Sequence, residues 1–419
     1  MIEMFETESK TVPITKQMVK EAYRKVKANQ GSAGVDKESL EEFQADLLNN
    51  LYKLWNRLSS GSYFPKTVRE VSIPKANGGK RKLGIPTVSD RIAQQVIKSY
   101  VEPILEAVFE HNSYGYRPLK SAHQAIEAVA ANVKQYAWVV DMDIKSFFDE
   151  VDHELLMKAL DCHVEEKWVK MYIKRWLEAS IQTQDGTLIT KEGKGTPQGG
   201  VISPLLSNLY LHYVLDKWLV KHYPAVAFVR YADDVIVHCS SEQEAKQLLE
   251  SIRERLKECK LRLNEEKTKL VYCKDYRRKK KNKYVKKFDF LGFTFKPQSI
   301  PVKNVGMIVF NNFAISQKAQ TRIVEGWKKL NIHRRSTLTI QDIAAAINPQ
   351  MRGIIRYYGK FKMWTLRNLI RRFHFRLVKW VLSKYKGFKG SRVKAYEWIS
   401  AIKASYPTLF YHWTIFDFV

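Results

Sequence analysis

Cysteine is scarce in this chain, and no long apolar run interrupts it. The 419 residues include four cysteines, at positions 162, 239, 259 and 273, and no two of them form a CxxC pair. This spacing excludes a classical zinc finger or zinc ribbon and argues against a disulfide framework, so it fits a reducing cytosol. No apolar segment approaches the roughly 20 residues that cross a bilayer. The first residues, MIEMFETESK, are acidic and polar, so we expect neither a signal peptide nor a membrane partner.

Acidic residues are also in short supply relative to basic ones. Lysine and arginine number 71 against 43 acidic residues, which gives a net charge of +28. A surplus of this size repels itself unless an anion neutralises it, and the usual anion is a phosphate backbone. The composition therefore indicates nucleic-acid binding, while a basic protein that is merely soluble stays open as the alternative. The length allows two or three domains.

The pattern along the chain mixes helices and strands. Apolar periodicity predicts helices over four segments, residues 14–30, 39–59, 89–109 and 203–221. Strand-like runs are VREVSIP, AWVVDM, VAFVR, VIVHC and FDFLGFTF, and an Asn77-Gly78-Gly79 turn predicts a hairpin. This mixture predicts an α+β fold.

The last part of the chain differs in composition. Residues 274–287 hold nine basic residues in fourteen, and residues 313–419 hold 21 basic and 4 acidic residues. From Phe313 onward the pattern is helical, with aromatics between the basic residues. We expect most of these aromatics to form a helical core and the basic residues to form a face suited to an RNA or RNA–DNA duplex. A domain boundary is expected near residues 300–315.

Three aspartates form the sharpest candidate site. Asp143 follows an apolar strand, and Asp233 and Asp234 occupy a predicted hairpin turn. Carboxylates brought together repel each other unless cations bind between them, and hard divalent ions such as Mg²⁺ prefer oxygen ligands. Two such ions about 4 Å apart can activate an attacking hydroxyl and stabilise a leaving pyrophosphate. An Asp-Asp pair alone, however, indicates only turn chemistry.

The sequence around these aspartates resembles a known family. VVDMDIKSFFDEVDH and FVRYADD followed by VIVHC resemble the catalytic motifs of reverse transcriptases. The blocks IPKANGGKRKLGIPTVSDRIAQQ, SYGYRP, TPQGGVISPLLSNLYL, LRLNEEKTKLV and FDFLGFTF resemble the group II intron-encoded reverse transcriptase/maturases of bacteria, in that family's order from about residue 14 to 300. The resemblance implies a right-hand polymerase of the α+β class, with an antiparallel sheet in fingers and palm and an all-helical basic thumb or maturase domain.

The resemblance also implies roles for individual residues. Asp143, Asp233 and Asp234 would be the catalytic carboxylates, and with the backbone of Ile144 they would hold two Mg²⁺ ions, for which Mn²⁺ could substitute. Phe148, five residues after Asp143, would block a ribose 2′-hydroxyl and so select deoxynucleotides, because this hydroxyl distinguishes RNA from DNA precursors. Core packing of Phe148 stays open as the alternative.

Further residues would bind the nucleotide and the primer. Lys75 and Arg81 match residues that grip the incoming triphosphate, with solvated hairpin charges as the alternative. Gln198 would shape the nucleotide and template site, and Lys267 would protonate or neutralise the leaving pyrophosphate. Leu291 and Gly292 match the turn that holds the primer end.

The resemblance divides the chain into three parts. Residues 1–312 would be the fingers and palm, with extension helices in residues 1–60; residues 313–385 would be the thumb or maturase domain, and residues 386–419 a short DNA-binding region. The HNH nuclease of many relatives is missing before Val419. We therefore expect no second-strand cleavage and a primer from a nicked or replicating strand.

These parts together imply an RNA-directed DNA polymerase, a nucleotidyltransferase that uses dNTPs to extend a DNA primer on an RNA template. It would also bind its group II intron RNA to assist splicing, and target DNA for retrohoming, within a ribonucleoprotein of the bacterial cytoplasm. Two alternatives stay open: a maturase that only assists splicing, and a domesticated or defence-associated reverse transcriptase of the same chemistry.

Overall fold

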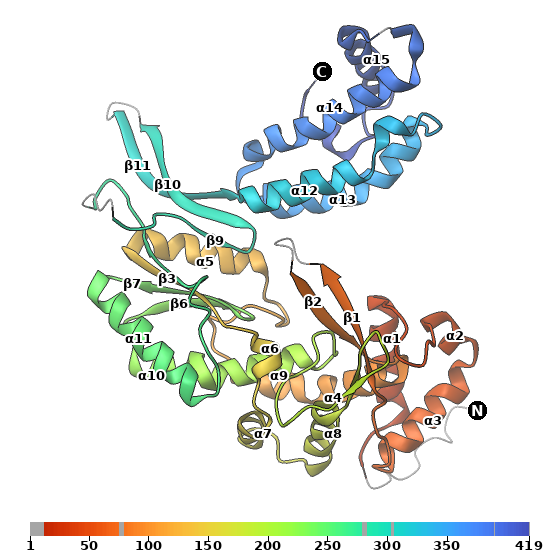
Figure 1. Ribbon diagram of the computed structural model, residues 1–419, viewed down its shortest axis with the longest axis vertical. Coiled ribbons are helices and arrows are strands. Elements are labelled where there is room, and N and C mark those ends of the chain that lie inside the picture. Colours follow the sequence, from red (N-terminus) through yellow and green to blue (C-terminus); the bar gives the residue numbers. More distant parts are fainter. Residues whose placement is uncertain (1–11, 75–78, 279–282, 303–305, 389, 419) are drawn as a thin grey trace. The chain divides into compact units, whose positions relative to one another are not determined.

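The computed structural model describes residues 12–74, 79–278, 283–302, 306–388 and 390–418. The chain forms two compact units, Met1–Val271 and Tyr272–Val419 (Figure 1). The predicted α+β fold class is confirmed, because mainly antiparallel sheets, with a parallel pair between β1 (Val68–Pro74) and β4 (Ile181–Gln182), occur with helices in the first unit and a mainly helical region ends the second.

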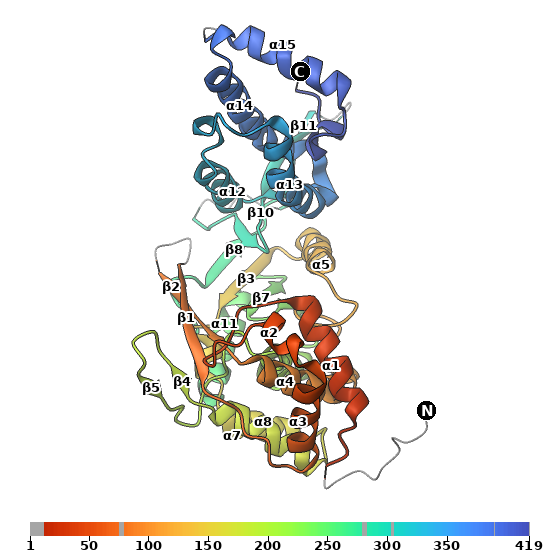
Figure 2. The ribbon, with the colours of Figure 1, turned by 90° about the vertical axis from the view of Figure 1, so that its right-hand side faces the viewer.

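Three helices begin the described part of the first unit, and a fourth, which follows strands β1 and β2 (Lys80–Ile85), packs with them. Helices α1 (Lys16–Asn29), α3 (Leu47–Ser59) and α4 (Val88–Glu106) pack together, and α2 (Leu40–Ala45) precedes α3 (Figure 2). The sequence predicts one helix over residues 39–59, but the helix is interrupted at Asp46, which has φ −120° and ψ 49°. Aspartate favours such a break because its side chain competes for local hydrogen bonds, here with Asn49.

The central sheet of the first unit has the strand order β6-β7-β3-β8. These strands are β6 (Ala227–Tyr231), β7 (Asp234–Cys239), β3 (Trp138–Asp143) and β8 (Lys269–Tyr272). Strand β7 lies antiparallel to both β6 and β3. Its side chains after Asp234 are buried, and α11 (Glu242–Glu258) packs on β3 and β7. Burial of both faces explains why these strands read as apolar runs.

The helix predicted over residues 203–221 is present, but it contains a wider turn. It consists of α9 (Ser203–Leu211), a π-helical segment η1 (His212–Asp216) and α10 (Lys217–His222). Residues in a π-helical segment are wound less tightly than in an α-helix, so the side chains that follow are rotated relative to those before it. Asn208 and Asp216, on this helix, are both buried.

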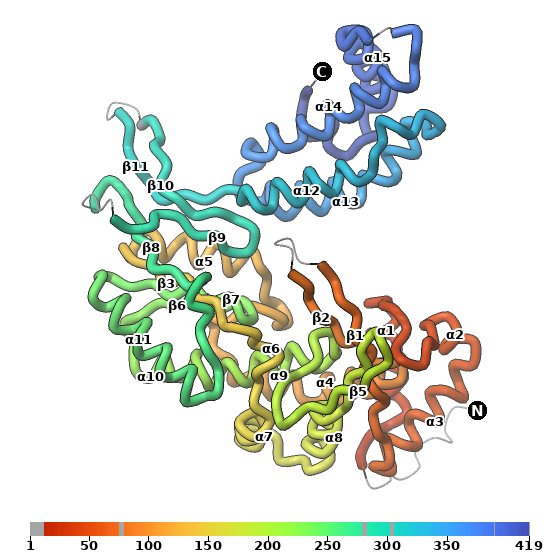
Figure 3. Tube along the Cα trace, viewed as in Figure 1, coloured from red at the N-terminus to blue at the C-terminus, as the bar shows by residue number. Residues whose placement is uncertain are grey.

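A second sheet has the order β2-β1-β4-β5, and Figure 3 shows its strands β1 and β2 side by side. It contains β1 (Val68–Pro74), β2 (Lys80–Ile85), β4 (Ile181–Gln182) and β5 (Leu188–Ile189). Strands β1 and β2 pair antiparallel from Arg69 with Ile85 to Pro74 with Lys80. Of the predicted turn, Asn77 and Gly78 lie outside the described residues. The remaining helices of this unit are α5 (Ala122–Gln135), α6 (Phe147–Glu150), α7 (His153–Asp161) and α8 (Lys167–Glu178).

The second unit begins with a three-stranded sheet of order β11-β10-β9. Its elements are β9 (Phe288–Phe290), β10 (Phe293–Val302), β11 (Gly306–Ile315), α12 (Gln317–Lys329), α13 (Ile340–Lys362), α14 (Arg367–Lys384) and α15 (Arg392–Ser405), with short 3₁₀ turns at Ile332–Arg334, Met363–Leu366, Lys386–Phe388 and Tyr411–Thr414. The predicted helical region therefore starts later than Phe313. That residue pairs with Phe295 across the strands, and the two rings stack at 5.0 Å.

The aromatics of the second unit divide between core and surface. Trp327, Phe373 and Trp380 are fully buried, as expected for a helical core. Trp364 is 72% exposed and Phe375 48% exposed. The core prediction therefore holds for the first three and not for the last two.

None of the helices within the described ranges is long and apolar enough to span a membrane. Cys239, Cys259 and Cys273 are buried thiols, and Cys162 is an exposed one. The four cysteines form no disulfide, as their spacing predicts.

Replacement of Trp380 with alanine should destabilise the chain strongly. The indole is fully buried and donates a hydrogen bond to the Arg335 carbonyl at 3.2 Å. Loss of a buried tryptophan leaves a cavity and costs about 3–5 kcal/mol. Trp364→Ala, at an exposed position, should change the free energy of unfolding by less than about 0.5 kcal/mol. Denaturant unfolding of the full chain measures both, and equal effects would contradict the assignment of Trp380 to the core.

Candidate active site

Strands β3 and β7 bring two of the predicted catalytic carboxylates to the same place. Asp143, the last residue of β3, lies directly opposite Asp234, the first residue of β7. Directly opposed residues on antiparallel strands have Cβ atoms about 4.5–5.5 Å apart and share one face of the sheet. The carboxylates of Asp143 and Asp234 therefore come from neighbouring points of one face.

Asp233 belongs to the turn between β6 and β7, which we call the acidic turn (residues 231–234). Tyr231 pairs with Asp234 across the hairpin, and Ala232 between them has φ 58°. This left-handed conformation closes the hairpin in two residues. The turn places Asp233 beside Asp234, so all three predicted carboxylates lie at one end of the central sheet.

Lys267 is paired with Asp143. Its Nζ lies 3.0 Å from Oδ2 of Asp143, and its side chain is 59% exposed. The segment that precedes Lys267 is bonded to β3, because Asn264 donates its N–H to the Asp143 carbonyl at 2.8 Å. Lys267, predicted to meet the pyrophosphate, thus lies at the acids and offsets part of their charge.

The pKa values of both carboxylates in the acidic turn are raised. Asp234 remains accessible to water, yet desolvation by the surrounding protein and the charges of Asp233 and Asp143 raise its pKa to about 6. Desolvation also raises the pKa of Asp233, and the Asp143 carboxylate adds to this rise. Lys267 and Arg81 oppose both shifts. Mutual repulsion of this kind is relieved when a cation binds between the groups.

The backbone of Ile144 lies in a short bridge to Leu263. The hydrogen bonds of this bridge use the carbonyl of Asp143 and the N–H of Lys145, which flank Ile144. In this type of antiparallel pairing the groups of the paired residue itself point away from its partner. The bridge therefore does not use the Ile144 carbonyl, which was the predicted fourth metal ligand.

In the part of the chain that the structure describes, no three His, Cys, Asp or Glu side chains are arranged to hold a metal ion. The ion pair with Lys267 directs one oxygen of Asp143 toward an ammonium group. The donor set nevertheless fits a hard cation, since it consists of carboxylate oxygens whose repulsion a divalent ion would relieve. Metal binding at this site remains a prediction.

Arg81, on β2, faces the same group of charges. The residue is exposed, and its guanidinium lowers the pKa of both Asp233 and Asp234 while desolvation and neighbouring carboxylates raise them. A cation placed there can meet the phosphates of a nucleotide bound at the acids. Lys75, its predicted partner, lies outside the described residues.

Two residues of the SYGYRP block belong to this site, although the sequence suggested no role for them. A Cβ atom on Gly115 would lie 2.3 Å from the Ala232 nitrogen, so only glycine allows this approach to the acidic turn. Tyr116 follows with φ 57°. Partial burial raises the pKa of its phenol, and the nearby Asp233 carboxylate adds to the rise. The only sequence signal for Gly115 and Tyr116 is their place in the SYGYRP block.

Gln198 lies in the PQGG loop (residues 197–200), which packs on β2. The Gly84 N–H donates to the Gln198 carbonyl at 2.8 Å. Gly199 has φ 127°, and a Cβ there would lie 2.5 Å from the Gly84 carbonyl oxygen. The loop is therefore fixed by backbone contacts, and the half-buried Gln198 side chain is left for other contacts.

Phe148 differs from its neighbour Phe147. Phe147 is buried, 3% exposed, and packs against Tyr210, whereas Phe148 is only half-buried. The carbonyl of Phe148 accepts a hydrogen bond from the Thr196 N–H at 2.7 Å, which joins α6 to the segment before Gln198. The Phe148 ring meets the Phe147 ring edge to face, with centroids 5.3 Å apart, so Phe148 is partly packed and partly exposed.

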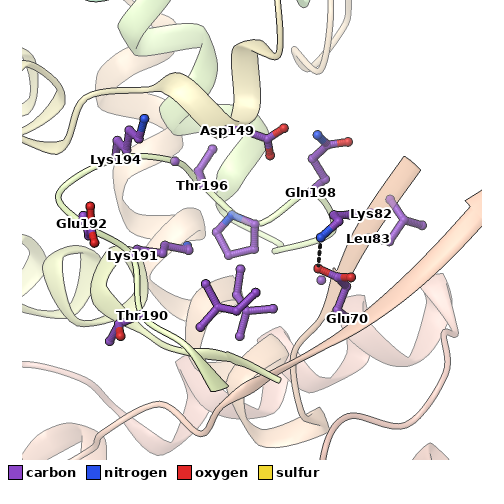
Figure 4. A pocket seen from close by; sticks show the side chains of 15 residues that line it. Glu70, Lys82, Leu83, Asp149, Thr190, Lys191, Glu192, Lys194, Thr196 and Gln198 are labelled. Atoms are coloured by element: carbon purple, nitrogen blue, oxygen red, sulfur yellow. Dashed lines mark ion pairs between the residues drawn. The ribbon is translucent and has the colours of Figure 1, made fainter. Parts of the chain in front are cut away.

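A cavity of about 390 Å³ adjoins this loop (Figure 4). Gln198, Asp149 and Lys191 are among the residues that line it, and an ion pair between Lys82 and Glu70, 3.2 Å long, borders it. The Lys191 ammonium is buried without a hydrogen-bond partner in the described ranges. Burial lowers the pKa of Lys191 to about 8, and Asp149 opposes this shift.

Leu291 and Gly292 form the turn between β9 and β10 in the second unit. Both have positive φ, 47° and 81°. The hydroxyl of Tyr357 donates to the Leu291 carbonyl at 2.8 Å, and a Cβ on Gly292 would lie 2.8 Å from the Tyr358 hydroxyl oxygen. Helix α13 thus supports the predicted primer-holding turn within its own unit.

The raised pKa of Asp234 should be directly measurable. In a ¹³C titration of the side-chain carboxyl without divalent ions, its midpoint should lie near 6, well above an ordinary aspartate. Asp143→Asn removes one negative neighbour and should lower that midpoint. A midpoint near 4 in the unmodified chain, or no change in the variant, would show that the carboxylates are not electrostatically coupled.

The chain matches two families in succession. Residues 73–295 match the family described as reverse transcriptase (RNA-dependent DNA polymerase), and residues 320–398 match the group II intron maturase-specific domain. Protein YkfC of Escherichia coli strain K12 is 36% identical, over 58% of this chain and 73% of its own.

Other similar proteins cover smaller parts or are more distant. The group II intron-encoded protein LtrA of Lactococcus lactis subsp. cremoris is 34% identical over 48% of this chain, which spans 33% of LtrA. Among solved structures, apo telomerase of Candida tropicalis aligns with a TM-score of 0.44 and 15% identity, over 55% of this chain and 53% of its own. Telomerase of Candida albicans with a telomeric RNA fragment aligns with a TM-score of 0.46 and 12% identity. This alignment covers 89% of this chain and 71% of the telomerase chain.

The family assignment rests on the two sequence families and on the relatives, and it agrees with the predicted motifs around Asp143 and the acidic turn. The chain belongs to the reverse transcriptase family of RNA-dependent DNA polymerases and carries a group II intron maturase-specific domain.

Proposed function

We propose that this chain extends a DNA primer on an RNA template by phosphoryl transfer at Asp143, Asp233 and Asp234. The observation that carries the proposal is the register of β3 and β7, which sets Asp143 opposite Asp234. Three carboxylates in one place do not stabilise the fold, because each raises the free energy of ionising the others. A reaction that requires cations at this point accounts for their presence.

The three carboxylates and the Ile144 carbonyl would hold two divalent ions, Mg²⁺ or in its place Mn²⁺. Bound there, the ions would activate the primer 3′-hydroxyl and stabilise the leaving pyrophosphate. Lys267 would exchange Asp143 for a phosphate oxygen when nucleotide binds, since its long side chain is exposed and its ion pair with Asp143 lies at the surface. Its charge then neutralises the pyrophosphate as it leaves.

The surrounding side chains would position the dNTP. Arg81 lies close enough to the acidic turn to influence the pKa of Asp233 and Asp234, and with Lys75 it would bind the triphosphate. Phe148 would stand against the sugar and exclude a 2′-hydroxyl. Gln198 would contact the nucleotide from the PQGG loop, and the cavity beside this loop would accommodate part of the template strand.

The second unit would bind nucleic acid without doing chemistry. The turn at Leu291 and Gly292 would hold the primer end. Residues 313–385 would act as the thumb or maturase domain and contact the group II intron RNA during splicing, and residues 386–419 would contact target DNA in retrohoming. Their support is the basic surplus, 21 basic against 4 acidic residues after position 312, which suits phosphate contacts.

The protein would then act in a ribonucleoprotein of the bacterial cytoplasm. A maturase without polymerase activity has less support, because it would not need the coupled carboxylates or the half-buried Phe148. A domesticated or defence-associated reverse transcriptase would share all of this chemistry.

Asp143→Asn should abolish DNA synthesis while leaving RNA binding nearly unchanged. The variant removes a metal-binding charge, and loss of an electrostatic stabiliser lowers kcat by more than about 100-fold. Incorporation of dNTPs on a primed RNA template measures synthesis, and filter binding of intron RNA measures affinity.

Asp161→Asn, which changes an exposed carboxylate paired with Lys170 at 2.8 Å, is the matched control and should behave as the unmodified chain. Normal synthesis by Asp143→Asn would overturn the assignment of the catalytic site. Loss of synthesis together with RNA binding would instead indicate a general defect in folding.

Phe148→Val should let ribonucleotides enter. Removal of the ring should reduce the preference for dNTPs over ribonucleotides by at least about tenfold, or about 1.4 kcal/mol. Phe147→Leu is the control: it disturbs a buried ring and should lower stability without changing the preference. Single-nucleotide incorporation kinetics measure the ratio, and an unchanged ratio in Phe148→Val would assign this ring to packing.

A further inference from the structure

Arg230 is a fully buried arginine two residues before Ala232 in the acidic turn. Its Nε and Nη2 donate to the two carboxylate oxygens of Asp216 at 2.7 and 2.5 Å. Nη1 donates to Asn208 Oδ1 at 2.9 Å and to the Ala232 carbonyl at 3.1 Å. One guanidinium therefore bonds the helix beneath the sheet and the backbone of the acidic turn.

The same contacts reach the SYGYRP segment. Asn208 donates from Nδ2 to the Gly115 carbonyl at 2.7 Å, and Gly115 packs against the Ala232 nitrogen. The Arg230 backbone also bonds this segment, since its N–H donates to Asn112 and its carbonyl accepts from Tyr114. We call this set, Asn208, Asp216, Arg230 and Gly115, the turn-support network.

The π-helical segment gives the network its geometry. Asn208 and Asp216 are eight residues apart, which on an α-helix leaves them about 80° apart around the axis, since each residue turns about 100°. A π-helical turn widens the repeat and absorbs about one residue. The spacing then equals about two full turns, and both side chains reach the same guanidinium. The π-helix His212–Asp216 lies between them and ends at Asp216 itself.

Stability alone does not account for a buried ion pair in this position. Removal of two charges from water is costly, and apolar residues of similar size often serve a core equally well. What apolar residues cannot supply is directional bonding, and Arg230 has five fixed donors. Here one of these donors fixes a carbonyl of the turn that carries Asp233 and Asp234.

We propose that Arg230 is a positioning residue, which holds the acidic turn in register with Asp143 so that the three carboxylates can bind divalent ions together. Because Arg230 is fully buried, it would act through the Ala232 carbonyl and not on the substrate directly. This inference rests on the proposed polymerase function. Groups that orient metal ligands typically change metal affinity or activity by about 10–100-fold when they are removed.

The test compares three variants of the full chain. Arg230→Met/Asp216→Leu replaces the buried pair with apolar side chains and should keep the fold, and Arg230→Lys keeps the charge with fewer donors. Arg91→Met is the matched control, because Arg91 is also buried and bonds the Gln30 and Ser32 carbonyls. The readouts are Mn²⁺ binding by electron paramagnetic resonance without substrate, thermal unfolding, and the kcat and dNTP KM of primer extension.

The double variant and Arg230→Lys should each bind Mn²⁺ about tenfold or more weakly, with a lower kcat and little change in the dNTP KM. Arg91→Met should lose stability and keep Mn²⁺ affinity. Should the double variant fail to fold, Arg230→Lys alone decides. Wild-type Mn²⁺ affinity in a folded Arg230 variant overturns the inference, and an unmodified chain that does not extend primers overturns the polymerase function instead.

Discussion

Repulsion between carboxylates, and the register that forces them together, is the constraint on which the rest of this structure depends. Asp143 and Asp234 cannot separate without breaking the β3–β7 pairing, which buries most of both strands. The resulting cost appears as the raised pKa of Asp233 and Asp234. Strongly perturbed pKa values are typical of functional sites. The cations Lys267 and Arg81 offset the repulsion between the carboxylates only in part.

The neighbouring elements can be understood as supports for this arrangement. Gly115 allows its segment to reach the acidic turn, Arg230 bonds the turn to the helix below, and the PQGG loop is fixed on β2 by Gly84. These contacts involve backbone atoms, so they fix the position of the chain and not only the side chains. The half-buried Phe148 and Gln198 remain available at the surface of this rigid frame. The proposed chemistry needs such a frame, because phosphoryl transfer depends on position and electrostatics.

Much of this could be predicted from the sequence, because the relevant signals are local. The apolar run before Asp143 and the apolar segments on both sides of Asp233 are enough to predict the strands. The family motifs then indicate that these strands lie together. The π-helical segment could not be predicted from the sequence. Its extra residue brings Asp216 to the buried Arg230, and this contact exists only in the folded chain. The break at Asp46 was missed because a local side-chain hydrogen bond to Asp46 interrupts a pattern that is otherwise periodic. The strand character of Phe313 was missed because its pairing with Phe295 overrides helical periodicity. Tyr116 is near Asp233 only through the fold.

The central claim is that Asp143 and the acidic turn share divalent ions. Anomalous diffraction from crystals of the full chain, grown with Mn²⁺, a primed RNA template and an incoming deoxynucleotide, measures this most directly. The account predicts two peaks about 4 Å apart, both within coordination distance of Asp143 and of Asp233 or Asp234. Ions bound elsewhere, or none near these carboxylates in a complex that holds nucleotide and primer, would contradict it.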